Sequence, residues 1–167
     1  MTARNVLGIA GWSGSGKTTL ITRLIPALVA KGLSVSTIKH AHHSFDIDTP
    51  GKDTWRHREA GASEVLISSR ARLALMREMR DAPEPELDDL LQRLAPVDLV
   101  LVEGYKSAGH PKIEVHRAAT GKPPLYPDDA TVLAVVSDAI TRADGRPVFA
   151  LDAIDEIAAF AASRVPA

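Results

Sequence analysis

The chain has 167 residues, of which 45% are hydrophobic and 25% charged, a length and composition typical of a single globular domain. Lysine and arginine number 20 against 21 aspartate and glutamate, and the resulting net charge of −1 argues against a protein that binds nucleic acid through bulk positive charge. The absence of cysteine excludes disulfides, thiolate metal sites and cysteine nucleophiles.

No stretch approaches 18 consecutive apolar residues, so we expect no membrane span. The short apolar run at 6–10 ends in a glycine-rich loop, whereas a secretory signal would be longer and end in a small-residue cleavage site. We therefore expect a cytoplasmic protein with neither a membrane nor a nucleic acid as its partner.

The first half of the chain alternates apolar runs with helical patterns. In chain order, the predicted elements are a strand at 6–10, a helix at 18–31, a strand at 34–39, a polar loop at 40–52, a helix at 53–61, and two strands at 65–68 and 71–76. Gly32 is expected to end the first helix and Pro26 to bend it, and Asp53 is the predicted N-cap of the second.

The second half continues the alternation. It is predicted to hold a break at 82–85, a helix at 86–95, strands at 98–102 and 112–116, a loop at 118–129, strands at 132–136 and 148–151, and a final helix ending near 163. Asp152 is the predicted cap of that helix, and the alternating pattern of 112–116 predicts an edge strand. Together these elements predict a three-layer α/β domain with a mainly parallel central sheet, helices on both faces and a small antiparallel extension.

Residues 11–19, GWSGSGKTT, match the phosphate-binding pattern G-x-x-x-x-G-K-[ST] between a predicted strand and a predicted helix. In such a P-loop the backbone N–H groups and the helix N-terminus hold phosphates, the lysine reaches the β- and γ-phosphates, and the hydroxyl ligates Mg²⁺. The alternative is a glycine-rich turn with a chance lysine. The predicted nucleotide-binding residues are Gly11, Ser13, Gly14, Ser15, Gly16, Lys17, Thr18 and Thr19.

The apolar run at 98–102 is followed by Glu103 and Gly104. An acid at the carboxyl end of a strand beside the P-loop strand is placed to hold Mg²⁺ or its waters. We predict Glu103 as a metal residue with Thr18, and Lys17 and Glu103 as the catalytic pair. The alternative for Glu103 is a simple acid before a turn, and Asp98, at the other end of the strand, is predicted to be a surface or cap residue.

The loop after the second strand is rich in possible ligands: His40, His42, His43, Asp46 and Asp48. These could bind a transition metal, but the irregular histidine spacing does not match a helical metal pair. We favour contacts to phosphate or Mg²⁺, with the aspartates, Asp48 above all, as the acids on the magnesium side. A polar, solvated loop is the alternative.

Asp138 follows the strand at 132–136, where P-loop GTPases hold the carboxylate that reads guanine. A carboxylate accepts hydrogen bonds from guanine N1 and N2, which adenine does not offer. The full Asn-Lys-x-Asp signature is missing, and a turn acid is an equal alternative. After Glu103, Lys106 and His110 could face the nucleotide or a second ligand, although a solvated loop is the simpler reading.

The segments GWSGSGKTTL, TIKHAHHSFDIDTPGKD, REAGA and DLVLVEGYK, between about 6 and 138, resemble the molybdopterin-guanine dinucleotide biosynthesis adaptor proteins, the MobB family. The resemblance implies a homodimeric GTP- and Mg²⁺-binding protein with feeble hydrolysis. It also implies an assistant to the guanylyltransferase that joins GMP to molybdopterin, and whether molybdopterin itself binds is open. It further places Gly51, Lys52 and Asp53 near the nucleotide.

Two other functions share the P-loop. A small-molecule kinase would use the arginines at 70, 72, 77 and 80 as a lid, although they flank an apolar, strand-like run. A metal-delivery GTPase chaperone would use the three histidines of the loop. No arginine finger or glutamine stands in a telling position, so intrinsic hydrolysis should be slow.

Overall fold

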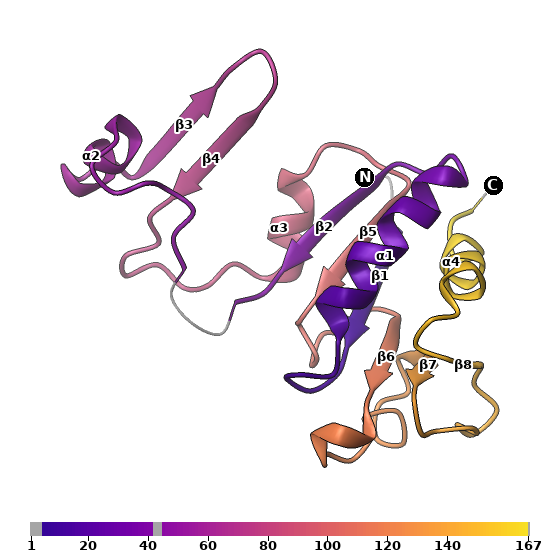
Figure 1. The fold of residues 1–167 in the computed structure, drawn as a ribbon. Helices are drawn as coiled ribbons and strands as arrows, with labels where there is room; N and C mark the ends of the chain where they lie inside the picture. The colour runs from indigo at the N-terminus through magenta and orange to yellow at the C-terminus, as the bar shows by residue number, and fades with distance from the viewer. Residues whose placement is uncertain (1–4, 42–44, 167) are drawn as a thin grey trace. The chain divides into compact units, whose positions relative to one another are not determined.

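The computed structural model describes residues 5–41 and 45–166. The chain forms two compact units: Met1–His40 with Leu87–Ala167, and Ala41–Glu86. Figure 1 traces both along the chain. Within the described residues, no helix combines the length and the apolar character that crossing a membrane requires.

The first unit is built on a six-stranded sheet in the order β2-β5-β1-β6-β7-β8, and every neighbouring pair is parallel (Figure 1). Its strands are β1 (Val6–Ala10), β2 (Val35–Lys39), β5 (Leu99–Glu103), β6 (Lys112–His116), β7 (Val132–Ser137) and β8 (Val148–Phe149). Its helices are α1 (Lys17–Ala30), α3 (Leu87–Arg93), α4 (Ile154–Ala162) and the short 3₁₀ turn η1 (Ala118–Thr120). The carboxyl ends of all six strands therefore meet at one edge of the sheet.

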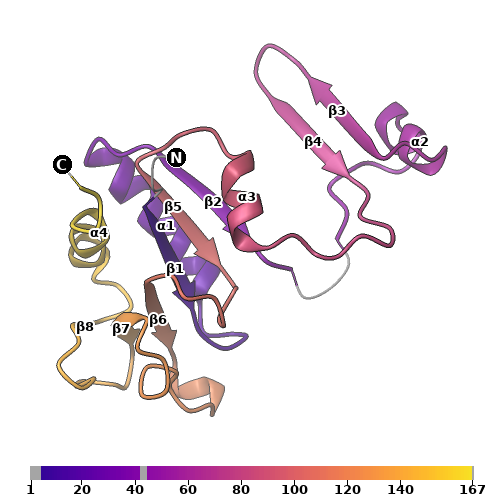
Figure 2. The same ribbon diagram turned by 180° about the vertical axis from the view of Figure 1, so that it is seen from behind.

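Helices cover both faces of this sheet, as the two opposite views show (Figures 1 and 2). On one face, Leu7 and Ile9 of β1 pack in a core with the apolar sides of α1 and α4. On the other face, Val100 and Val102 of β5 pack with α3. β5 is apolar throughout because both of its faces are covered. The predicted three-layer α/β class is confirmed.

The predicted edge position of 112–116 is wrong, because β6 lies between β1 and β7 and is buried along its length. Its alternating polar side chains face a covering loop instead of solvent. Glu114 accepts hydrogen bonds from the backbone N–H groups of Leu125 and Tyr126 at 2.7 and 2.9 Å. Lys112 and His116 likewise find partners in the segments around 108, 122 and 129–137. An alternating strand can thus be central when a polar loop satisfies its polar face.

The end of α1 is as predicted, whereas two predicted caps are wrong. Gly32 has φ 84° and donates to the Val29 carbonyl, and the Leu33 N–H reaches back to Leu28, which completes a Schellman motif. The N-cap of α2 is Lys52 and that of α4 is Ala153, so Asp53 is the first residue of its helix and Asp152 lies outside its helix. Neither N-cap makes a side-chain hydrogen bond, and Asp53 lies in a first turn that favours acids through the helix dipole.

The second unit holds α2 (Asp53–Glu59) and an antiparallel pair, β3 (Glu64–Ser68) and β4 (Leu73–Arg77). This pair is the predicted antiparallel extension, with its second strand beginning two residues later than expected. Arg58 ties the unit together through ion pairs to Asp46, Asp48 and Glu78. These three carboxylates raise the pKa of Arg58 above its ordinary value.

Candidate nucleotide-binding site

The predicted P-loop connects the carboxyl end of β1 to the first turn of α1, and it needs glycine at both of its ends. Gly11 has φ 143°, and a Cβ there would lie 2.3 Å from the Val115 carbonyl oxygen of β6. Gly16, the N-cap of α1, has φ 98°. The backbone can follow this path only without side chains at these two positions, and it leads the loop to the helix N-terminus, where anions bind.

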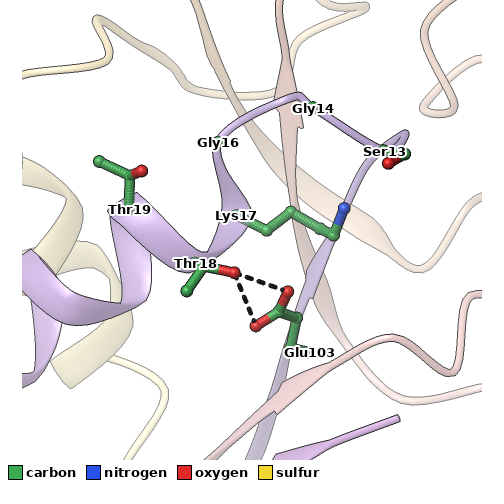
Figure 3. A pocket seen from close by; sticks show the side chains of 7 residues that line it. All are labelled: Ser13, Gly14, Gly16, Lys17, Thr18, Thr19 and Glu103. Carbon is green, nitrogen blue, oxygen red and sulfur yellow. Dashed lines mark hydrogen bonds between the residues drawn. The ribbon is translucent and has the colours of Figure 1, made fainter. Parts of the chain in front are cut away.

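Lys17 extends back along the loop toward its start (Figure 3). Its Nζ donates to the carbonyl oxygens of Gly11 and Trp12, each at 3.0 Å. Burial lowers the pKa of Lys17, and the nearby Glu103 carboxylate opposes that shift. The ammonium group is thus held over the loop, close to the backbone amides that would surround a phosphate.

Thr18 points at Glu103, across the gap between α1 and β5 (Figure 3). Its Oγ1 donates to Oε1 of Glu103 at 3.0 Å and lies 3.3 Å from Oε2. Lys39, at the end of β2, lies 3.7 Å from the same carboxylate. A hydroxyl and a carboxylate are oxygen ligands of the kind that Mg²⁺ prefers, so this pair fits the predicted metal position.

A hollow of about 390 Å³ opens over these groups. Its lining residues are Ser13, Gly14, Gly16, Lys17, Thr18, Thr19 and Glu103 (Figure 3). Seven of the predicted site residues therefore share one surface. Of the predicted P-loop residues, Gly11 and Ser15 do not line the hollow. The side chain of Ser15 is buried under the loop, and its Oγ has no partner among the described residues.

On the other side of the loop lie Arg117 and Asp138, the residues that follow β6 and β7. Asp138 is exposed and its Oδ1 accepts the backbone N–H of Ala118 at 3.0 Å. The Arg117 guanidinium packs against Gly16. Sequence reasoning missed Arg117; the available signal was a charged residue directly after a predicted strand, but the strand was expected at an edge.

Four predicted residues, Asp48, Gly51, Lys52 and Asp53, belong to the second unit. Asp48 accepts hydrogen bonds there from the Thr49 N–H, the Thr54 hydroxyl and the Arg58 Nε. Asp46 binds the same Arg58 side chain, and this hydrogen bond lowers the pKa of Asp46. The approach of these residues to a nucleotide or to Mg²⁺ stays a prediction.

Of the three histidines in the predicted loop, His42 and His43 lie outside the described residues. The His40 ring stacks at a tilt on Tyr105, with 4.9 Å between the ring centroids. Among residues 5–41 and 45–166, no group of three or more histidine or acidic side chains is placed to hold a metal ion. The metal-delivery hypothesis stays a prediction.

The remaining candidates lie apart from the hollow. The Lys106 ammonium lies 4.7 Å from the centre of the Trp12 ring, beside the P-loop, and His110 packs over Gly8 of β1. Burial lowers the pKa of His110. Arg70 and Arg72 lie in the turn between β3 and β4 of the second unit, so a lid role for them stays a prediction.

Comparisons with known proteins agree over the span that holds this site. A family model described as molybdopterin guanine dinucleotide synthesis protein B matches residues 6–138. The molybdopterin-guanine dinucleotide biosynthesis adapter protein of Haemophilus influenzae is 46% identical over 158 residues, which are 93% of this chain and 86% of the relative. That of Escherichia coli K12 is 45% identical over 136 residues, or 80% and 78%. A crystal structure of molybdopterin-guanine biosynthesis protein B is 34% identical with a TM-score of 0.71, covering 95% of this chain and 98% of that one.

Proposed function

This chain belongs to the molybdopterin guanine dinucleotide synthesis protein B (MobB) family and serves as an adapter in the biosynthesis of that dinucleotide, and we propose that it does so as a GTP-binding protein. The observation that carries the proposal is the convergence of Lys17, Thr18 and Glu103 on the hollow over the P-loop. Lys17 would bind the β- and γ-phosphates, while Thr18 and Glu103 would hold Mg²⁺ between them.

Guanine specificity is proposed for Asp138. Asp138 follows β7, two strands beyond β1 in the sheet, and β5 with Glu103 pairs with β1 on its other side. One carboxylate oxygen accepts the Ala118 N–H, and the side chain is otherwise exposed. A carboxylate can accept from both N1–H and the N2 amino group of guanine, whereas adenine presents no such pair of donors.

Hydrolysis is proposed to be slow in the isolated chain. Rapid GTP cleavage needs an oriented water and a positive charge that stabilises the transition state at the γ-phosphate. The described lining of the hollow offers Lys17 and hydroxyl groups, but no glutamine and no arginine. The partner of this chain is proposed to be the guanylyltransferase that attaches GMP to molybdopterin.

Self-association is proposed through the antiparallel pair of the second unit. One face of this pair carries Leu66, Leu73 and Leu75, which are 59, 63 and 47% exposed. A two-stranded pair is marginally stable alone, and a second copy covering this face would bury the leucines. Sedimentation equilibrium should then show that the wild type is a dimer. Leu66→Glu should weaken this dimer, whereas the control Val29→Glu, at an exposed position of α1, should leave it intact. A wild-type monomer would contradict the proposal.

The experiment that tests nucleotide binding is calorimetric titration of the full chain with GTP and with ATP, each in excess Mg²⁺. The proposal predicts tighter binding of GTP. Equal affinity for the two nucleotides would contradict the guanine assignment, and binding of neither would contradict the function of the P-loop.

A further inference from the structure

Arg117 lies directly against the last glycine of the P-loop. It is the first residue after β6, the neighbour of β1 on the side away from β5 and Glu103. A Cβ built on Gly16 would lie 3.3 Å from the Arg117 Nε and 3.5 Å from its Nη2. The guanidinium therefore contacts the backbone that leads into the first turn of α1.

This guanidinium forms no ion pair within the part of the chain that the structure describes. No hydrogen bond engages it there, and its Nε is buried without a partner. Its backbone is nevertheless fixed, since the Arg117 carbonyl accepts from the N–H and the hydroxyl of Thr120 at 3.1 and 2.8 Å. A buried guanidinium N–H without an acceptor is costly, so the geometry calls for an acceptor at this position.

The surroundings make an anion the acceptor that fits. The N-terminus of α1 carries a partial positive charge, and Lys17 adds a full one. Arginine cannot lose its proton to relieve the repulsion between these groups. Glu103 offsets part of the charge of Lys17, but the guanidinium itself forms no ion pair within the described residues, so an anion beside it would reduce the repulsion among these groups. A phosphate matches the planar fork of the guanidinium.

The order of the strands indicates which phosphate this is. Along the carboxyl edge of the sheet, Glu103 ends β5, the P-loop follows β1, Arg117 follows β6 and Asp138 follows β7. The Ala118 N–H bond to Asp138 places Arg117 and Asp138 in the same corner. In the proposed site, Mg²⁺ and the terminal phosphates lie at Glu103 and the base lies at Asp138. The part of the nucleotide next to Arg117 is then the one between them, where the phosphate chain joins the ribose.

We propose that Arg117 binds the α-phosphate of the guanine nucleotide, a role that rests on the proposed GTP binding. The experiment titrates wild type, Arg117→Ala and Arg117→Lys with GDP and with GTP in Mg²⁺ by calorimetry, and measures kcat at saturating GTP. Because Arg117→Ala removes a charged hydrogen bond, we expect it to weaken the binding of GDP and of GTP by the same factor, about ten- to a hundredfold. Arg117→Lys should recover part of this affinity.

Exposed Arg93 in the last turn of α3 provides the matched control, and Arg93→Ala should bind as wild type does. If Arg117→Ala does not fold, Arg117→Gln replaces it, because it keeps most of the side-chain volume without the charge. Unchanged GDP affinity would overturn the proposal, as would an unchanged affinity with a large fall in kcat, which would assign Arg117 to the γ-phosphate. A wild type that binds neither nucleotide would instead refute the proposed function from which this role follows.

Discussion

Thr18 and Glu103, 85 positions apart in the sequence, are joined by a hydrogen bond of 3.0 Å from the threonine hydroxyl to the carboxylate. The contact exists because α1 begins beside the carboxyl end of β5, the strand that pairs with β1. It brings together two oxygen ligands suited to Mg²⁺ at the mouth of the P-loop.

Glu103→Gln should weaken GTP binding about tenfold or more in Mg²⁺ and leave it unchanged or tighter in EDTA. A carboxylate repels phosphates and helps to bind them only through the cation that it holds. The substitution should therefore weaken GTP binding only when Mg²⁺ is present. Titration calorimetry with and without EDTA measures both. Asp89→Asn on the exposed side of α3 is the control, and an equal loss in both conditions would contradict a metal role.

Lys17→Ala should abolish measurable GTP binding, a loss of at least about a hundredfold, while thermal unfolding stays cooperative. The ammonium group bonds only to the Gly11 and Trp12 carbonyls of the loop in the described structure, so its removal leaves the hydrophobic core untouched. Lys31→Ala at the exposed end of α1 is the matched control. Retained GTP affinity in the Lys17 variant would refute the phosphate role of the loop.

Asp138→Asn should erase most of the preference for GTP over ATP and create affinity for XTP. Asparagine replaces one acceptor oxygen by a donor, and xanthine presents a carbonyl oxygen where guanine has its amino group. Competition of the three nucleotides against labelled GDP gives the ranking. A variant that keeps the wild-type ranking would leave Asp138 as a turn acid that only binds the Ala118 N–H.

Asp98→Asn should lower stability without changing nucleotide affinity, because Asp98 precedes β5 at the end of the sheet away from the P-loop. The Ser34 hydroxyl and N–H donate to its Oδ2 at 2.6 and 2.7 Å, and these bonds lower the pKa of Asp98 below its ordinary value of 3.8. The stabilisation is thus present above about pH 4 and is lost as the pH falls through the lowered pKa.

Urea unfolding at pH 7 and at pH 3 measures this dependence. The wild type should lose more stability between these pH values than Asp98→Asn does. An equal acid sensitivity of the two proteins would show that the Ser34 bonds contribute nothing to folding.

Local features of the sequence were sufficient to predict the P-loop, β1, α1 and the position of Glu103. Each rests on residues adjacent in the chain, such as the apolar run of β5 that ends in an acid. Asp98 was predicted as a surface or cap residue, and the structure confirms its surface position, where its carboxylate accepts hydrogen bonds from Ser34. The sheet class followed from the alternation of strands and helices.

Features that depend on contacts between distant segments could not be predicted. The burial of β6 depends on a loop that supplies amide donors to Glu114, so its alternating pattern was mistaken for that of an edge strand. The same error hid Arg117, whose contact with Gly16 follows from β6 lying beside β1. The two helix caps were wrong by one residue, because either of two adjacent polar or small residues can begin a helix.

We propose that this adapter acts on a guanylyltransferase through its bound nucleotide. The most direct measurement is the rate of guanine dinucleotide formation by the purified transferase, with GTP and Mg²⁺, in the presence of wild type, Lys17→Ala or no added chain. Wild type should raise the rate, and the Lys17 variant should leave it at the level without added chain. A transferase that responds equally to both proteins, or to neither, would contradict the account.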